Sequence, residues 1–256
     1  MQISEVNGVD HISPKKIGTS HLEKVTTSSS SKSETRYITS IPVDLDKLDT
    51  ENSGRVILCD TPGFGDTAGP EVDIANALSI VKAIQKSQSV KPVILVSYKS
   101  IGDRYQGLKS IAYILAGMIP SIKEHTKCIS YLFTKYPEKE QKSIHASIKN
   151  VKENLTEEEK SDTGFSSLFN GMFSKTKKGA CVVNPLKSEE SNDILDELIN
   201  SKSIERPREE FRFSLNESSR SVLQDQARRH EINITRFLKR HDYNLIKFRL
   251  DELRKL

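Results

Sequence analysis

The order of apolar and polar residues predicts strands that alternate with helices along most of the chain. Four short runs are almost continuously apolar, as in strands that are covered on both faces. These runs are 55–60, 92–98, 128–136 and 180–184. A fifth strand is predicted at 36–43, where β-branched residues alternate and Pro42 favours the edge of a sheet.

Between these runs, apolar residues recur at the spacing of amphipathic helices. The predicted helices cover 72–87, 107–119, 143–155 and 191–200. Apolar strands that alternate with helices predict an α/β fold, in which a mostly parallel sheet has helices on both faces.

Two kinds of segment fall outside this alternation. Residues 1–34 are polar and end in a serine-rich stretch, so they are predicted to form a low-complexity loop, and 157–164 is predicted to be a solvated connection. After Pro207 the chain is highly charged and lacks any strand pattern. We therefore predict an α/β domain over 1–205 and a helical segment over 206–256.

The C-terminal segment is predicted to form one long helix or a helical hairpin, and a short coiled coil is an alternative. Ile234, Leu238, Leu245 and Phe248 fall near one face of it. Such a face can simply pack on its own domain, or it can serve self-association or a protein partner.

Composition narrows the classes of function. The 256 residues are 35% apolar and 29% charged, which is typical of a soluble globular protein. The net charge is +4, but basic and acidic residues are interspersed, so nucleic acid is not an expected partner. No apolar stretch is long enough to span a bilayer, and the first residues lack the hydrophobic segment of a signal peptide.

The three cysteines indicate a reducing compartment. Cys59, Cys128 and Cys181 each lie in or beside a predicted strand, and no pair has the spacing of metal ligands. We expect them to be reduced core thiols in a cytoplasmic protein.

The residues after the first of the four apolar runs carry the most specific chemistry. Residues 56–67 read VILCDTPGFGDT, so the predicted strand ends at Asp60 and a glycine-rich turn follows. Ligands of open α/β sheets bind at the carboxyl ends of the strands, where a carboxylate can hold a hydrated Mg²⁺ beside a phosphate. Gly63 would let its backbone N–H approach that phosphate closely.

The stretch Asp60-Thr61-Pro62-Gly63 resembles the motif of P-loop GTPases that senses Mg²⁺ and the γ-phosphate. Its extension Phe64-Gly65-Asp66 is similar to the version in septins and in AIG1-type GTPases. The resemblance implies a G domain that binds GTP and Mg²⁺ and hydrolyses GTP by in-line attack of water. It also implies that Asp60 positions the metal and Gly63 senses the γ-phosphate, although no glutamine is clearly placed to orient the water.

Two further strand ends fit the resemblance in part. Thr134 and Lys135 match the start of the guanine-binding motif, in which the lysine stem packs over the base, but Pro137 occupies the position of the base-reading aspartate. Asn184 is placed like a base-contacting residue of AIG1-type proteins. Taken alone, Lys135 is equally well explained as a solvated lysine, and Asn184 as a turn residue.

The resemblance also implies a threonine in the first switch loop that closes over the phosphate and Mg²⁺. Thr26 and Thr27 are the candidates for nucleotide binding, and Thr27 is the candidate metal ligand.

The phosphate-binding loop itself is missing from the sequence. None of the 12 glycines is followed by lysine, and the nearest approximation is Gly107-Leu108-Lys109-Ser110. The chain is therefore expected either to be an N-terminally incomplete GTPase or to have lost the loop, and to bind nucleotide poorly. Two alternatives remain: a nucleotide-free pseudo-GTPase that acts as an interaction module, and a base pocket that accepts adenine.

Overall fold

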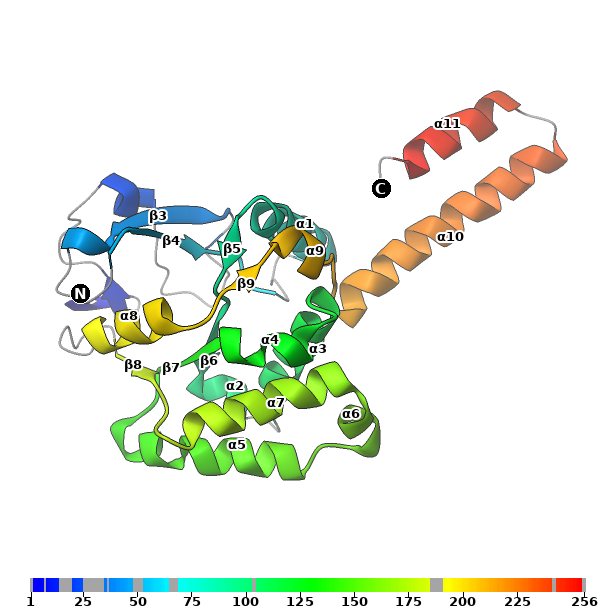
Figure 1. The fold of residues 1–256 in the computed structure, drawn as a ribbon. Coiled ribbons are helices and arrows are strands. Elements are labelled where there is room, and N and C mark those ends of the chain that lie inside the picture. Colours follow the sequence, from blue (N-terminus) through cyan, green and yellow to red (C-terminus); the bar gives the residue numbers. More distant parts are fainter. Residues whose placement is uncertain are drawn as a thin grey trace.

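The computed structural model describes most of the chain as an α/β body with a projecting helical hairpin (Figure 1). The described residues are 2–6, 8–13, 20–24, 35, 37–47, 53–64, 69–102, 105–184, 191–240 and 243–254.

A parallel sheet of three strands lies at the centre of the body. It contains β6 (Val93–Ser97), β7 (Ser130–Thr134) and β8 (Val182–Val183), in that order. Leu95 is opposite Leu132, and Phe133 is opposite Val182. The predicted parallel pairing is thus confirmed for these strands, each of which is shorter than its apolar run.

The other described strands form antiparallel pairs. β3 (Thr39–Asp44) pairs with β4 (Arg55–Asp60), and β5 (Ser89–Val90) pairs with β9 (Ile204–Glu205). The prediction of a mostly parallel sheet is therefore correct only for the central strands, and the fold as a whole is mixed α/β.

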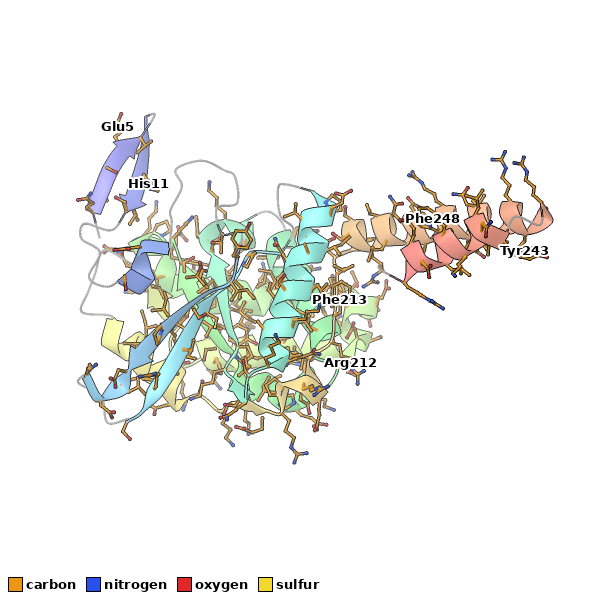
Figure 2. All side chains as sticks on the ribbon, turned by 90° about the horizontal axis from the view of Figure 1, so that it is seen from above. Glu5, His11, Arg212, Phe213, Tyr243 and Phe248 are labelled. Carbon is orange, nitrogen blue, oxygen red and sulfur yellow. The ribbon has the colours of Figure 1, made fainter. Side chains whose placement is uncertain are left out.

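A hairpin replaces part of the loop that was predicted at the N-terminus. β1 (Gln2–Val6) and β2 (Val9–Ser13) pair with each other, and Gly8 between them has a φ of 78°. Figure 2 shows Glu5 and His11 on this hairpin, at the margin of the molecule. The signal for it is an Asn-Gly pair at 7–8 flanked by alternating apolar residues, which the emphasis on polar composition overlooked.

The prediction that the runs at 55–60 and 92–98 are covered on both faces is wrong. β6 is covered on one face only, since Ile94 and Val96 are buried but Leu95 is 59% exposed.

β4 is more exposed still. Ile57 is 60% exposed, Leu58 is 38% exposed, and Cys59 is exposed, so Cys59 is no core thiol. The main contacts of β4 are with β3 and the short turn η2 (Leu45–Lys47). An apolar strand is buried only where other layers cover its faces. β4 also has an open edge, because β3 is the only described strand that pairs with it.

Helices flank the central sheet. In Figure 1, α5 and α7 lie on one side of it, and α1 and α9 lie on the other. The helices of the body are α1 (Pro70–Gln85), α2 (Tyr98–Gly102), α3 (Gln106–Met118), α4 (Ile122–His125), α5 (Ile144–Glu153), α6 (Glu157–Ser161), α7 (Thr163–Thr176), α8 (Ser191–Asn200) and α9 (Pro207–Glu210). Short 3₁₀ helices cover Ser20–Lys24 (η1), Thr126–Cys128 (η3) and Glu138–Ser143 (η4). The four predicted helices are therefore confirmed to within a few residues.

The sequence pattern above did not predict α6 and α7. The interpretation of 157–164 as a solvated connection is wrong, because Thr156 caps α6 and Asp162 accepts a hydrogen bond from the Phe165 amide at 2.9 Å. Phe165, Leu168, Phe169 and Met172 then form the buried face of α7. This face joins Val96, Phe133 and Ile148 in the main hydrophobic core.

The C-terminal segment is a helical hairpin. α10 (Glu217–Lys239) extends away from the body, and α11 (Tyr243–Leu253) folds back along it (Figure 1). Tyr243 and Phe248 are 69% and 55% exposed, and Figure 2 labels both on this hairpin. No helix in the described parts of the chain is long and apolar enough to cross a membrane.

Candidate functional site at the strand ends

Parallel pairing brings three of the predicted base-binding residues together. Thr134, the last residue of β7, pairs with Ser97 of β6 on one side and with Val183 of β8 on the other. Lys135 and Asn184 directly follow the paired residues Thr134 and Val183, so they leave the same edge of the sheet. The carboxyl ends of parallel strands are where ligands of α/β sheets bind.

Lys135 has an unusual backbone at this edge. Its φ is 59°, in the left-handed region that residues with a β carbon rarely adopt, and its side chain is exposed. This conformation costs about 1–2 kcal/mol relative to a right-handed one, and such costs are concentrated at functional sites. The strained turn directs the chain away from β7 immediately after Thr134.

Two tyrosines lie beside these residues and were not singled out from the sequence. The Tyr136 ring contacts Tyr98 and Phe133 edge-on, with centroid distances of 5.2 and 5.8 Å. The Tyr136 hydroxyl is buried and has no hydrogen-bond partner among the described residues. Burial, with a smaller contribution from Tyr98, raises the pKa of Tyr136, so the hydroxyl remains a neutral donor. The only sequence signal for it is a large aromatic residue directly after Thr134-Lys135.

The turn that contains Asp60 and Gly63 lies at the end of β4. Asp60 is exposed, and one of its carboxylate oxygens accepts a hydrogen bond of 3.3 Å from the Thr35 hydroxyl. Open space surrounds the position that a β carbon on Gly63 would take. Phe64 packs against the main core and so anchors the far side of the turn. β4 pairs only with β3 among the described strands, so strand pairing does not join Asp60 to Lys135 and Asn184.

The fit of this turn to Mg²⁺ depends on one carboxylate. In the part of the chain that the structure describes, no three His, Cys, Asp or Glu side chains gather as a metal site. Mg²⁺ is usually held by one or two carboxylates together with waters and substrate phosphates, so Asp60 fits as a partial ligand. Thr26 and Thr27, the candidates for the switch loop, lie outside the described residues.

The sequence that most resembles a phosphate loop has a different role. Gly107 to Ser110 lie inside α3, and the Lys109 ammonium donates to both carboxylate oxygens of Glu159, at 2.7 and 2.8 Å. A β carbon on Gly107 would lie 3.3 Å from Ser100, so this glycine permits close packing of α2 on α3. Lys109 is therefore part of the fold and does not serve as a phosphate ligand.

Comparisons with protein-family models and with curated proteins found no match. The strand ends present an exposed carboxylate at Asp60, open space at Gly63, and the side chains of Lys135, Tyr136 and Asn184.

Proposed function

We propose that this chain is a GTPase-like protein that binds a guanine nucleotide and Mg²⁺ at the carboxyl ends of its strands. The observation that carries the proposal is the Asp60–Gly63 turn. Its carboxylate is exposed at the end of a strand and forms no ion pair with a described residue. A carboxylate placed in this way is available to a metal ion, and the glycine leaves room for a phosphate.

The proposal gives each group a separate task. Asp60 would hold Mg²⁺ directly or through water, and the Gly63 amide would donate to a phosphate oxygen. The stem of Lys135 would pack over the base, and the Asn184 side chain would hydrogen-bond to it. Mg²⁺ supplies charge neutralisation when it is bound. The described residues lack a phosphate loop, so we expect weak affinity and propose no hydrolysis step for this chain alone.

Two observations favour a second function, that of a pseudo-GTPase that binds another protein. Pro137 occupies the position where a guanine-specific carboxylate would stand. The helical hairpin also exposes large apolar side chains, including Ile232, Tyr243 and Phe248, which are 59%, 69% and 55% exposed. Apolar side chains on a projecting element can serve protein contacts.

Competition between labelled GTP and ATP separates these functions. The purified chain is titrated with each nucleotide at high concentration, with Mg²⁺ and with EDTA. Mg²⁺-dependent binding that prefers GTP supports the proposal. Equal or stronger binding of ATP indicates an adenine pocket, and no binding of either nucleotide supports the pseudo-GTPase.

The variant Asp60→Ala tests the role of the metal ligand. Removal of the carboxylate should abolish the Mg²⁺-dependent part of GTP binding, because Asp60 is the only acidic residue among the described turn residues 60–64. Asp44→Ala is the matched control, since Asp44 lies at the opposite end of the same strand pair. Equal effects of the two substitutions would contradict the assignment.

A further inference from the structure

A polar hollow is lined by none of the strand-end residues just described. It occupies about 270 Å³ between α7 and the segment formed by α4 and η3. α4 and α7 are in contact and lie side by side in Figure 1. Because η3 directly precedes β7, the hollow is near the amino end of that strand, whereas Lys135 follows its carboxyl end.

The chemistry of the hollow is that of an anion site. Lys123, Lys127 and Lys175 line it together with the hydroxyl-bearing residues Thr126, Ser167 and Ser174. The described residues that line it include no carboxylate. Among the described residues, none forms an ion pair with any of the three lysines.

The local sequence explains how these groups converge. Ser167, Gly171 and Ser174 recur at intervals of four and three residues, so they share one face of α7. Gly171 lets α7 approach η3, because a β carbon there would lie 3.3 Å from the Thr126 β carbon. Lys123 and Lys127 are one helical turn apart on the facing segment.

Electrostatics favours a bound anion in this place. Three ammonium groups that line one hollow repel one another, because like charges do so at any separation within the screening length. An anion converts this repulsion into charge-assisted hydrogen bonds, which the hydroxyl groups can supplement. The volume is just below the usual range for small-molecule pockets, so it suits a compact polyanion.

We propose that this hollow binds a phosphate-bearing ligand through Lys123, Lys127 and Lys175. A soluble sugar phosphate and the headgroup of a phosphorylated lipid present the same chemistry to these lysines. The proposal does not depend on nucleotide binding at the strand ends, because it uses none of the same residues.

Titration with inositol 1,4,5-trisphosphate, followed by amide NMR, tests the proposal. The largest shift changes should fall in 123–127 and 167–175. The variants Lys127→Glu and Lys175→Glu should each weaken binding about tenfold or more, since each replaces an attraction by a repulsion. Lys178→Glu makes the same charge change just beyond α7 and outside the hollow, and should weaken binding less than about twofold.

Vesicles that contain phosphatidylinositol 4,5-bisphosphate, compared with phosphatidylcholine vesicles, identify the source of the phosphate. If the protein binds these vesicles more tightly than free inositol trisphosphate, and Lys127→Glu abolishes that binding, the hollow is a site for lipid headgroups. If vesicle binding is equal or weaker, the hollow is a site for soluble ligands. Equal losses in Lys178→Glu and Lys127→Glu would overturn the proposal in favour of non-specific charge. Loss in Lys135→Glu but not in Lys127→Glu would place the ligand at the strand ends instead.

Discussion

Lys135 links the backbone of the fold to the proposed base site. Lys135 adopts a left-handed conformation that usually requires glycine. The next residue, Tyr136, has a buried hydroxyl without a hydrogen-bond partner among the described residues. An unfavourable conformation next to an unsatisfied donor is more typical of a binding site than of a structural turn.

Lys135→Gly should therefore stabilise the protein while it weakens nucleotide binding. Relief of the left-handed strain should raise the free energy of unfolding by about 1 kcal/mol. The larger conformational entropy of glycine in the unfolded chain offsets part of this gain. Lys135→Ala is the control, because it removes the same side chain but keeps the strain. Urea unfolding of both variants measures the difference, and equal stabilities would show that the turn is not strained.

Glu159 is the clearest case of a carboxylate committed to the fold. It is 7% exposed and accepts hydrogen bonds from the Lys109 ammonium and from the Thr156 amide, at 2.8 Å. Burial raises the pKa of Glu159, but the hydrogen bonds from Lys109 and Thr156 outweigh it, so the net shift is downward from 4.5. A lowered pKa means that the ion pair stabilises the fold above about pH 4.5 and that this contribution is lost at lower pH.

Glu159→Gln should destabilise the protein by about 3 kcal/mol at pH 7, because Lys109 is left largely buried without its counter-charge. The variant should also lose less stability than the wild type when the pH is lowered from 7 to 4. Glu157→Gln is the control, since Glu157 is exposed and solvent screens its ion pair with Lys160. Identical pH profiles for the wild type and Glu159→Gln would refute this account of the pair.

At the scale of elements, burial distinguishes strands that look alike in sequence. β4 and β6 are both short and apolar, yet they differ in coverage. Ile94 on the covered face of β6 is 7% exposed and Leu95 on its other face is 59% exposed, whereas β4 has no buried residue and its Ile57 is 60% exposed. The difference arises because α1, α3 and α7 supply core residues around β6, while the main contacts of β4 are with β3 and η2.

The same substitution in these two strands should therefore have different costs. Ile94→Ala should lower the free energy of unfolding by about 2–5 kcal/mol, as expected for a cavity in a core. Ile57→Ala should cost about 1 kcal/mol or less, because more than half of its surface already contacts solvent. Chemical unfolding of both variants measures this, and a similar large cost for Ile57→Ala would mean that β4 is covered in solution.

The sequence was informative where a local pattern determines the element. Helical periodicity located α1, α3, α5 and α8, and continuous apolar runs located β6 and β7. The pattern could not show that β4 lacks a covering layer, because coverage depends on residues distant in the chain. The pattern did not predict α7, because small polar residues interrupt its apolar positions. Those residues form one wall of the lysine-lined hollow.

At the scale of the whole molecule, a buried polar cluster attaches the projecting hairpin to the body. Asp73 in α1 is 2% exposed and accepts hydrogen bonds from the Asn216 amide group at 2.6 Å and the Ser219 hydroxyl at 2.8 Å. Asn216 directly precedes α10 and Ser219 lies in its first turn, so this cluster joins the start of α10 to α1.

Asp73→Ala should loosen that attachment. Asn216 and Ser219 would lose a shared acceptor in a buried position, at a cost of about 1–3 kcal/mol. Hydrogen exchange of the first turns of α10 should accelerate more than exchange of β7, which lies in the core. Glu71→Ala, in the same first turn of α1 but exposed, is the control. Unchanged exchange in α10 would show that the cluster does not hold the hairpin.

The site could be predicted from the sequence only in part. Thr134, Lys135 and Asn184 were brought together by parallel strand pairing, which the apolar runs indicate. The placement of Asp60 relative to them depends on how the β3–β4 pair packs, and no local pattern determines that. The contribution of Tyr136 depends on its contacts with Tyr98, which begins α2 directly after β6, and with Phe133 near the end of β7.

The most direct test of the central claim uses Mn²⁺ as a paramagnetic substitute for Mg²⁺. In amide NMR spectra recorded with excess GTP, added Mn²⁺ should broaden the signals of residues 60–64 first, then those of Lys135 and Asn184. The same titration of Asp60→Ala should leave these signals sharp. Broadening that is absent from 60–64, or that persists in Asp60→Ala, would contradict the proposal that this turn holds a metal ion beside a guanine nucleotide.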